Sequence, residues 1–121
     1  MNNRTKKLLF DVLESGRSIR GWCQDRTFAE YEANRQLRRA VEREFEIIGE
    51  ALNHLSQDDP ATAARIDRLP RIVGFRNRII HGYDTVDDAT VWGVIDEHLA
   101  TLLAKVEALL QEPDAEAQNS R

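Results

Sequence analysis

The sequence has little cysteine, proline, glycine and lysine, and it has no long apolar run. A single cysteine, Cys23, excludes an intramolecular disulfide and indicates a reducing, cytoplasmic location. No stretch of about 18 apolar residues occurs, so no segment is expected to span a membrane. The opening residues MNNRTKK do not begin a signal peptide, because the apolar stretch after them is too short and too mixed. With only 3 prolines and 6 glycines, long helices are permitted.

The composition that remains is that of one folded domain. The chain has 121 residues, of which 41% are hydrophobic and 31% are charged, a balance typical of a globular protein. We expect the domain to cover residues 1–111 and an acidic, flexible tail to cover residues 112–121. The net charge of −4 argues against a general nucleic-acid binder. Residues 65–83 nevertheless hold five arginines and a single acid, Asp67, and arginine grips phosphate groups in two-pronged fashion.

Apolar residues recur at spacings of three and four, which predicts amphipathic helices and no strands. The predicted helices cover about residues 5–20, 28–55, 60–67, 70–81 and 88–110. Asp59 and Pro60 are expected to cap and open the short third helix, and Gly82 to end the fourth in a left-handed conformation. The fold prediction is an all-α, up-and-down bundle of four to five helices. The apolar faces are wider than one bundle core requires, which favours a dimer.

The candidate site lies in the segment RNRIIHGY and consists of Arg76, Asn77, His81 and Tyr83. These residue types suit RNA cleavage without a metal or another cofactor. Histidine exchanges protons near neutral pH and can act on the ribose 2′-hydroxyl. A fixed arginine can stabilise the charge that builds up on phosphorus. The asparagine could orient the histidine or a phosphate oxygen, and the tyrosine could bind a phosphate or the ribose.

The spacing of the two principal residues limits how they can meet. Arg76 continues the apolar face of its predicted helix, so it should point toward an interior or an interface. In a straight helix, Arg76 and His81 point roughly 140° apart, because five steps of about 100° separate them. A site that uses both therefore needs the helix to unwind near His81, or a second copy of the chain.

Two motifs of this sequence resemble those of one protein family. The segment RNRIIHGY is similar to the R-x4-H-x-Y signature of the HepT-like toxins, which belong to the HEPN group of small helical ribonucleases. The segment EIIGEA, residues 46–51, is similar to the E-x-I-G-E-A pattern on the long helix of that family. The helix order and the late position of the first motif also match, and the resemblance covers about residues 5–110.

The resemblance implies a HEPN-like homodimer in which both motifs line a shared cleft. It also implies cleavage of RNA, with tRNA as a favoured target and without a metal. Arg76 and His81 match the catalytic pair, and Asn77 matches the polar residue that often follows the arginine. Tyr83 matches the tyrosine to which a cognate minimal nucleotidyltransferase antitoxin adds AMP. Such a modification would place bulk and negative charge in a cleft that binds phosphates.

Two alternative hypotheses accompany this one. The chain could be a non-catalytic helical binding partner of a minimal nucleotidyltransferase, which holds RNA or nucleotide without cutting it. It could also be a plain structural bundle, in which Arg76 and His81 lie apart. Glu46 and Glu50 are four residues apart, as are some metal ligands in helical bundles. No Glu-x-x-His partner accompanies them, so a structural role beside an arginine is the favoured interpretation.

Overall fold

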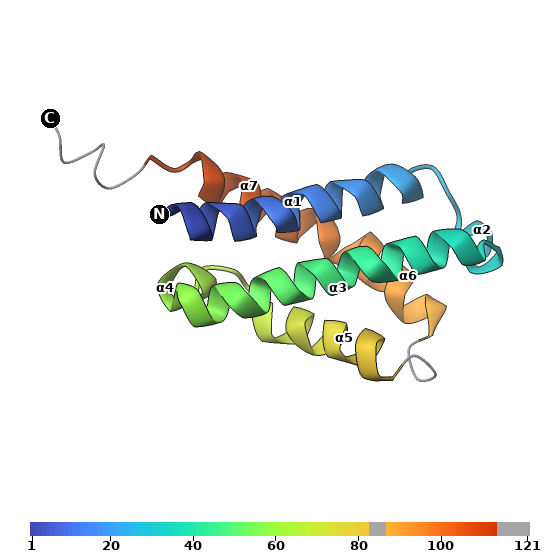
Figure 1. Ribbon diagram of the computed structural model, residues 1–121. Helices are drawn as coiled ribbons and strands as arrows, with labels where there is room; N and C mark the ends of the chain where they lie inside the picture. The colour runs from blue at the N-terminus through green and yellow to red at the C-terminus, as the bar shows by residue number, and fades with distance from the viewer. Residues whose placement is uncertain (83–86, 114–121) are drawn as a thin grey trace, which may run out of the picture.

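The helices run alternately up and down along one axis, as the sequence predicts (Figure 1). This computed structural model describes residues 1–82 and 87–113, and those residues form seven helices and no strand. The longer helices are α1 (Asn3–Cys23), α3 (Arg35–Asp58), α5 (Leu69–His81), α6 (Asp88–Glu97) and α7 (Leu99–Gln111). Two short helices, α2 (Phe28–Ala33) and α4 (Pro60–Ala63), connect them.

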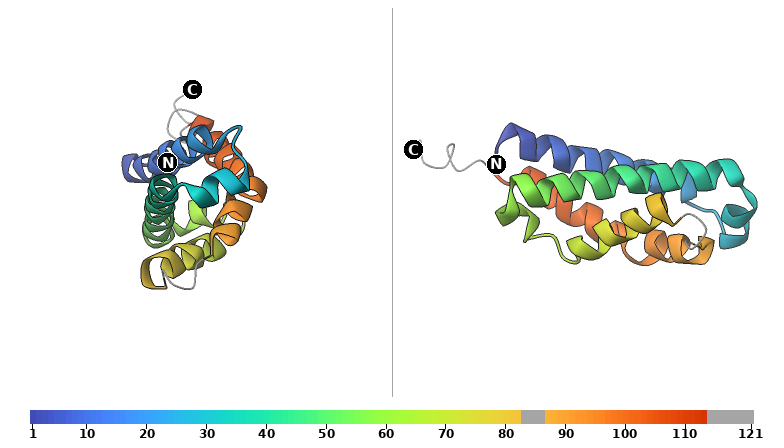
Figure 2. Two further views of the ribbon diagram at one scale, coloured as in Figure 1. Left: turned by 90° about the vertical axis from the view of Figure 1, so that its right-hand side faces the viewer. Right: turned by 60° about the horizontal axis from the view of Figure 1, so that its bottom comes forward.

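The core lies where α3 meets α1 on one side and α5 on the other, with α7 packed against α1 (Figures 1 and 2). Most of its fully buried side chains belong to the apolar residues that recur at spacings of three and four, as Leu9 and Val12 of α1, Ile48 of α3 and Val106 of α7 illustrate; Tyr31 of α2 is an exception. At about 25 cal/mol per Å² of apolar surface, such burial is the main force that holds the helices together.

The long helix predicted for residues 28–55 is wrong in one respect, because it is two helices. Asn34 separates α2 from α3, with an extended backbone conformation, and its side chain accepts a hydrogen bond from the Leu37 amide at 3.0 Å. Asparagine is a favoured N-cap, since its side chain can satisfy a helix-start amide. The chain therefore turns at Asn34, and α2 packs against α6 instead of continuing α3.

The last predicted helix is also divided, at His98. Here the reason lies in packing, because no proline or glycine stands at the break. The first half, α6, lies against α2, where Trp92 contacts the Phe28 and Tyr31 rings at centroid distances of 6.4 and 5.3 Å. The second half, α7, lies against α1. Two partners in different directions favour a bend between the halves, and the prediction of four to five helices becomes seven.

The remaining differences concern helix ends. Asp59 caps α4 and Pro60 begins it, as predicted, but α4 is only four residues long. The prediction for Gly82 is wrong: its φ is −135°, outside the left-handed region.

Among residues 1–82 and 87–113, no helix is both long enough and apolar enough to cross a bilayer. Helix α7 ends at Gln111, and residues 114–121 of the predicted tail lie outside the described residues.

Candidate functional site

Helix α5 carries three of the four candidate residues, Arg76, Asn77 and His81, and is packed against α3. Arg68, just before the helix, has a left-handed φ of 64°, which is uncommon for a residue other than glycine. Pro70 follows in the first turn, where its ring suits the helix. Phe75 packs edge-on against Phe45 of α3, with ring centroids 5.2 Å apart, and Ile79 is buried one turn further on. These contacts set the position of the last two turns of α5.

The two sequence motifs meet at Gly49 and Arg76. A Cβ atom built on Gly49 would overlap the Cβ and Cγ atoms of Arg76. Only glycine therefore leaves space for the arginine to lie directly on the α3 backbone. Glycine in the middle of a helix costs about 1 kcal/mol relative to alanine, so its presence here has a structural reason. The reason is that the Arg76 side chain lies directly against the Gly49 backbone; we call this position the seat of Arg76.

The Arg76 guanidinium is held in place by its neighbour. Its Nη1 donates a hydrogen bond to the Asn77 side-chain oxygen at 2.9 Å. Its Nε is buried and has no hydrogen-bond partner within the described parts of the chain. A buried donor without a partner is uncommon in folded proteins and calls for an explanation. The arrangement gives a positioned cation whose side chain is still partly exposed.

His81 lies on a different side of the helix. It is the last residue of α5 and is exposed, and within residues 1–82 and 87–113 its side chain makes no hydrogen bond or ion pair. The helix remains regular to this point, because the Gly82 amide still donates to the Arg78 carbonyl at 2.9 Å. Unwinding near His81, the first route by which Arg76 and His81 might meet, is not seen. In one chain the two side chains diverge by roughly 140°.

The second motif contributes two glutamates to the surface of α3. Glu46 pairs with Arg43, one turn earlier, at 3.1 Å, and Glu50 lies 3.9 Å from His54. The predicted role of Glu46 beside an arginine agrees with the first contact. In the described ranges no three His, Cys, Asp or Glu side chains are grouped as a metal site would require. The two glutamates thus act in the structure as surface partners of basic side chains.

The structure brings some predicted site residues together and leaves others apart. The Arg76 and Asn77 side chains are hydrogen-bonded to each other, whereas no side-chain hydrogen bond links either of them to His81 within the described residues. Tyr83 lies outside the described residues. The contact between Gly49 and Arg76 was not predicted from the residues. Gly49 stands inside a long helix that continues on both sides of it. A glycine in such a position was the available signal that another element approaches that helix closely.

Comparison with known proteins identifies relatives over most of the chain. A family model described as HepT-like, Ribonuclease HepT-like, matches residues 12–109. A Methanocaldococcus jannaschii protein whose name provisionally gives it as an RNase is 32% identical over 104 residues, which are 84% of this chain and 93% of that protein. A Thermococcus cleftensis protein, named provisionally as a ribonuclease HepT, is 28% identical over 109 residues, which are 90% of this chain and 98% of that protein. No solved structure matches the chain significantly.

Proposed function

This chain belongs to the HepT-like ribonuclease family, and from that premise we propose that it is the metal-independent endoribonuclease toxin of a toxin–antitoxin pair. The observation that carries the proposal is the seat of Arg76. Its side chain lies on Gly49 and its guanidinium is bound by Asn77, so a positive charge is held in place before any substrate arrives. In many enzymes, preorganised charge of this kind makes the largest single contribution to the rate enhancement.

The proposed reaction uses groups of the protein and of the RNA alone. His81 accepts the proton of a ribose 2′-hydroxyl, whose oxygen attacks the adjacent phosphorus. The new bond joins the 2′-oxygen to phosphorus, and the bond from phosphorus to the 5′-oxygen breaks. The leaving 5′-oxygen takes up a proton, which His81 can return. The products are a 2′,3′-cyclic phosphate and a 5′-hydroxyl end. Arg76 stabilises the added negative charge on the phosphorane, and Asn77 positions Arg76.

A homodimer solves the problem that Arg76 and His81 diverge in one chain. Helix α5 is regular to His81, so a second copy is the remaining route by which one phosphate meets both residue types. The surface beside the histidine supports a contact between copies. Ile80, its neighbour on α5, is a large apolar residue that is 37% exposed. Burial of this side chain against a second copy would be favourable. The proposed cleft therefore lies between the α5 helices of two protomers.

The substrate and the partner follow from the family resemblance. We propose tRNA as the substrate and a minimal nucleotidyltransferase as the antitoxin, both in the cytoplasm. The antitoxin would add AMP to Tyr83, two residues after His81 in the sequence. The added phosphate carries negative charge, and the nucleoside adds bulk. The charge would repel an RNA phosphate near His81, and the bulk would block its binding there.

An RNA-cleavage assay tests the proposal. Purified protein, with unmodified Tyr83 verified by mass spectrometry, is incubated with total tRNA in the presence of EDTA, and the product ends are analysed. We expect cyclic-phosphate ends, and we expect His81→Ala to lose at least about 100-fold in rate while its circular dichroism and unfolding midpoint stay unchanged. A His81→Ala variant that cleaves as fast as the wild type would contradict the assignment. No cleavage by the wild type would favour the non-catalytic binding partner.

A further inference from the structure

A groove of about 830 Å³ lies beside the candidate site, and the proposed reaction does not use it. It lies between the segment that begins α5 and the facing sides of α6 and α7. Its rim carries Arg68, Arg71 and Lys105, and its floor includes Ile72, Phe75 and Leu102. The lining also includes the carboxylates of Asp67 and Glu97, so basic side chains outnumber acidic ones around an apolar base.

The cations at the rim are available to a ligand. Within residues 1–82 and 87–113, Arg71 and Lys105 take part in no ion pair, and the one polar contact of the Arg68 side chain is with the His98 ring at 3.5 Å. Arg65, which also lines the groove, differs because Glu112 binds it with contacts of 2.9 and 2.6 Å. Arg68 and Arg71 have no ion-paired carboxylate, whereas Lys105 interacts electrostatically with the Glu112 carboxylate. Exposed cations such as the two arginines attract phosphate groups.

The floor supplies what a phosphate site alone would lack. The Phe75 ring is fixed edge-on by Phe45, and Ile72 and Leu102 are only partly buried beside it. Apolar and aromatic surface of this kind accepts the faces of nucleobases, and it does so without a strong sequence preference. Bases are free to make such contacts in a single strand and are stacked on one another in a duplex. The combination favours single-stranded RNA over double-stranded RNA.

The groove reaches Phe75, one residue before the candidate site on α5, but it opens on another face of that helix, toward α6 and α7. Arg68, Arg71, Ile72 and Phe75 follow the three- and four-residue spacing of one helix face. Phe75 directly precedes Arg76, and Arg71 lies about 7.5 Å before Arg76 along the helix axis, at about 1.5 Å per residue. Because Arg71 and Arg76 are five residues apart, their side chains point roughly 140° apart. A strand whose reacting phosphate lies at Arg76 would therefore have to turn around α5 to place its neighbouring nucleotides in the groove.

We propose that this groove binds the single-stranded RNA that flanks the cleaved phosphate. Arg71 and Lys105 contact the sugar-phosphate backbone from opposite sides, and Ile72, Phe75 and Leu102 receive the bases. The inference rests on the proposed function, since it gives the ribonuclease its preference for single-stranded segments. It assigns substrate binding to residues outside the RNRIIHGY motif.

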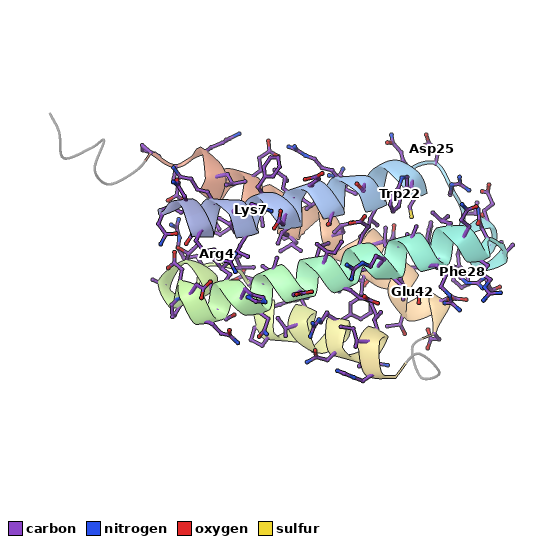
Figure 3. All side chains as sticks on the ribbon, viewed as in Figure 1. Arg4, Lys7, Trp22, Asp25, Phe28 and Glu42 are labelled. Carbon is purple, nitrogen blue, oxygen red and sulfur yellow. The ribbon has the colours of Figure 1, made fainter. Side chains whose placement is uncertain are left out.

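The first test measures RNA binding directly. The probe is a fluorescein-labelled single-stranded RNA of mixed sequence, and the readout is anisotropy over a series of salt concentrations. The groove variant is Arg71→Gln with Lys105→Gln, and the control is Lys7→Gln with Arg20→Gln on α1, which removes the same charges (Figure 3 shows Lys7). All proteins carry His81→Ala, so the probe stays intact.

We expect the groove variant to bind roughly five- to tenfold more weakly, and the control to stay within about twofold of the parent protein. The slope of log K against log salt should fall by roughly 0.7 for each phosphate contact removed. Equal losses in the groove variant and the control would overturn the proposal, because only general charge would then matter. Unchanged binding by the groove variant would overturn it as well.

Two further measurements separate this inference from the proposed function. With His81 intact, the groove variant should lose kcat/KM for tRNA by roughly the same factor and retain it for the dinucleotide UpA, which is too short to reach the groove. If the wild type cuts no RNA but binding still depends on Arg71 and Lys105, catalysis fails and the groove stands. If sedimentation velocity shows that the groove variant changes its oligomeric state while RNA binding is kept, the groove is a protein interface and the proposal is wrong.

Discussion

Replacing Gly49 by alanine tests the contact between the two sequence motifs. The added methyl group would overlap the Cβ and Cγ atoms of Arg76, which belong to the inflexible base of that side chain. The overlap is relieved only if α5 moves away from α3 or if Arg76 leaves its seat. Either change displaces the guanidinium from the position in which Asn77 holds it.

The expected magnitude comes from two opposing effects. Overpacking of a core contact costs about 1–3 kcal/mol, whereas alanine is about 1 kcal/mol better than glycine inside a helix. We therefore expect Gly49→Ala to lower the free energy of unfolding by about 0–2 kcal/mol. Activity should suffer far more, because a displacement of about 1 Å at a catalytic group can cost about 100-fold in rate.

A second glycine provides the matched control. Gly74 also lies inside a helix, but a Cβ atom built on it has no neighbour within 4 Å. Gly74→Ala should therefore raise stability by about 1 kcal/mol and leave cleavage of tRNA unchanged. Urea unfolding and initial cleavage rates measure both variants. If Gly49→Ala behaves as Gly74→Ala does, more stable and fully active, the proposed seat of Arg76 is refuted.

Two capping residues give further predictions. Asn34→Ala should cost about 1 kcal/mol in urea unfolding, because the bond to the Leu37 amide is lost; a neutral or stabilising effect would instead favour one continuous helix through Asn34. The Asp59 carboxylate accepts hydrogen bonds from Thr62 and Thr5, which lower its pKa from the ordinary value of 3.8. Because the folded pKa is the lower one, this stabilisation is present above about pH 4 and is lost as the pH falls through the folded pKa. Asp59→Asn should therefore lose less stability than the wild type between about pH 5 and pH 3; equal losses in urea midpoints would contradict this.

Much of the fold could be predicted because it is a local property of the sequence. Apolar stripes at spacings of three and four predicted the helices and their order, and Asp59 with Pro60 predicted the start of α4. The family was predicted from two short motifs and is confirmed, together with the ribonuclease class that its name gives. The roles of Arg76, Asn77, His81 and Tyr83 remain predictions.

The features that were missed depend on contacts between distant segments. The bend at His98 arises because α6 and α7 pack on different partners. No proline or glycine at the bend indicates it in the sequence. The Gly49 contact joins two residues that are 27 positions apart. The groove collects Arg71 from α5 and Lys105 from α7, and each of these residues alone is an ordinary surface cation. Periodicity describes one helix at a time, so it cannot reveal such combinations.

The buried Nε of Arg76 has a consequence for how this protein balances stability against function. In the unfolded chain, water satisfies that donor; in the folded chain, within the described residues, nothing does. A donor deprived of its partner in this way typically lowers stability by about 1–3 kcal/mol. If an apolar side chain of similar length replaced Arg76 and packed against Gly49, this penalty would be avoided. The bundle would then be more stable but would lack the cation. If Arg76 has the proposed role, this loss of stability is the compromise expected where a functional residue occupies a partly buried position.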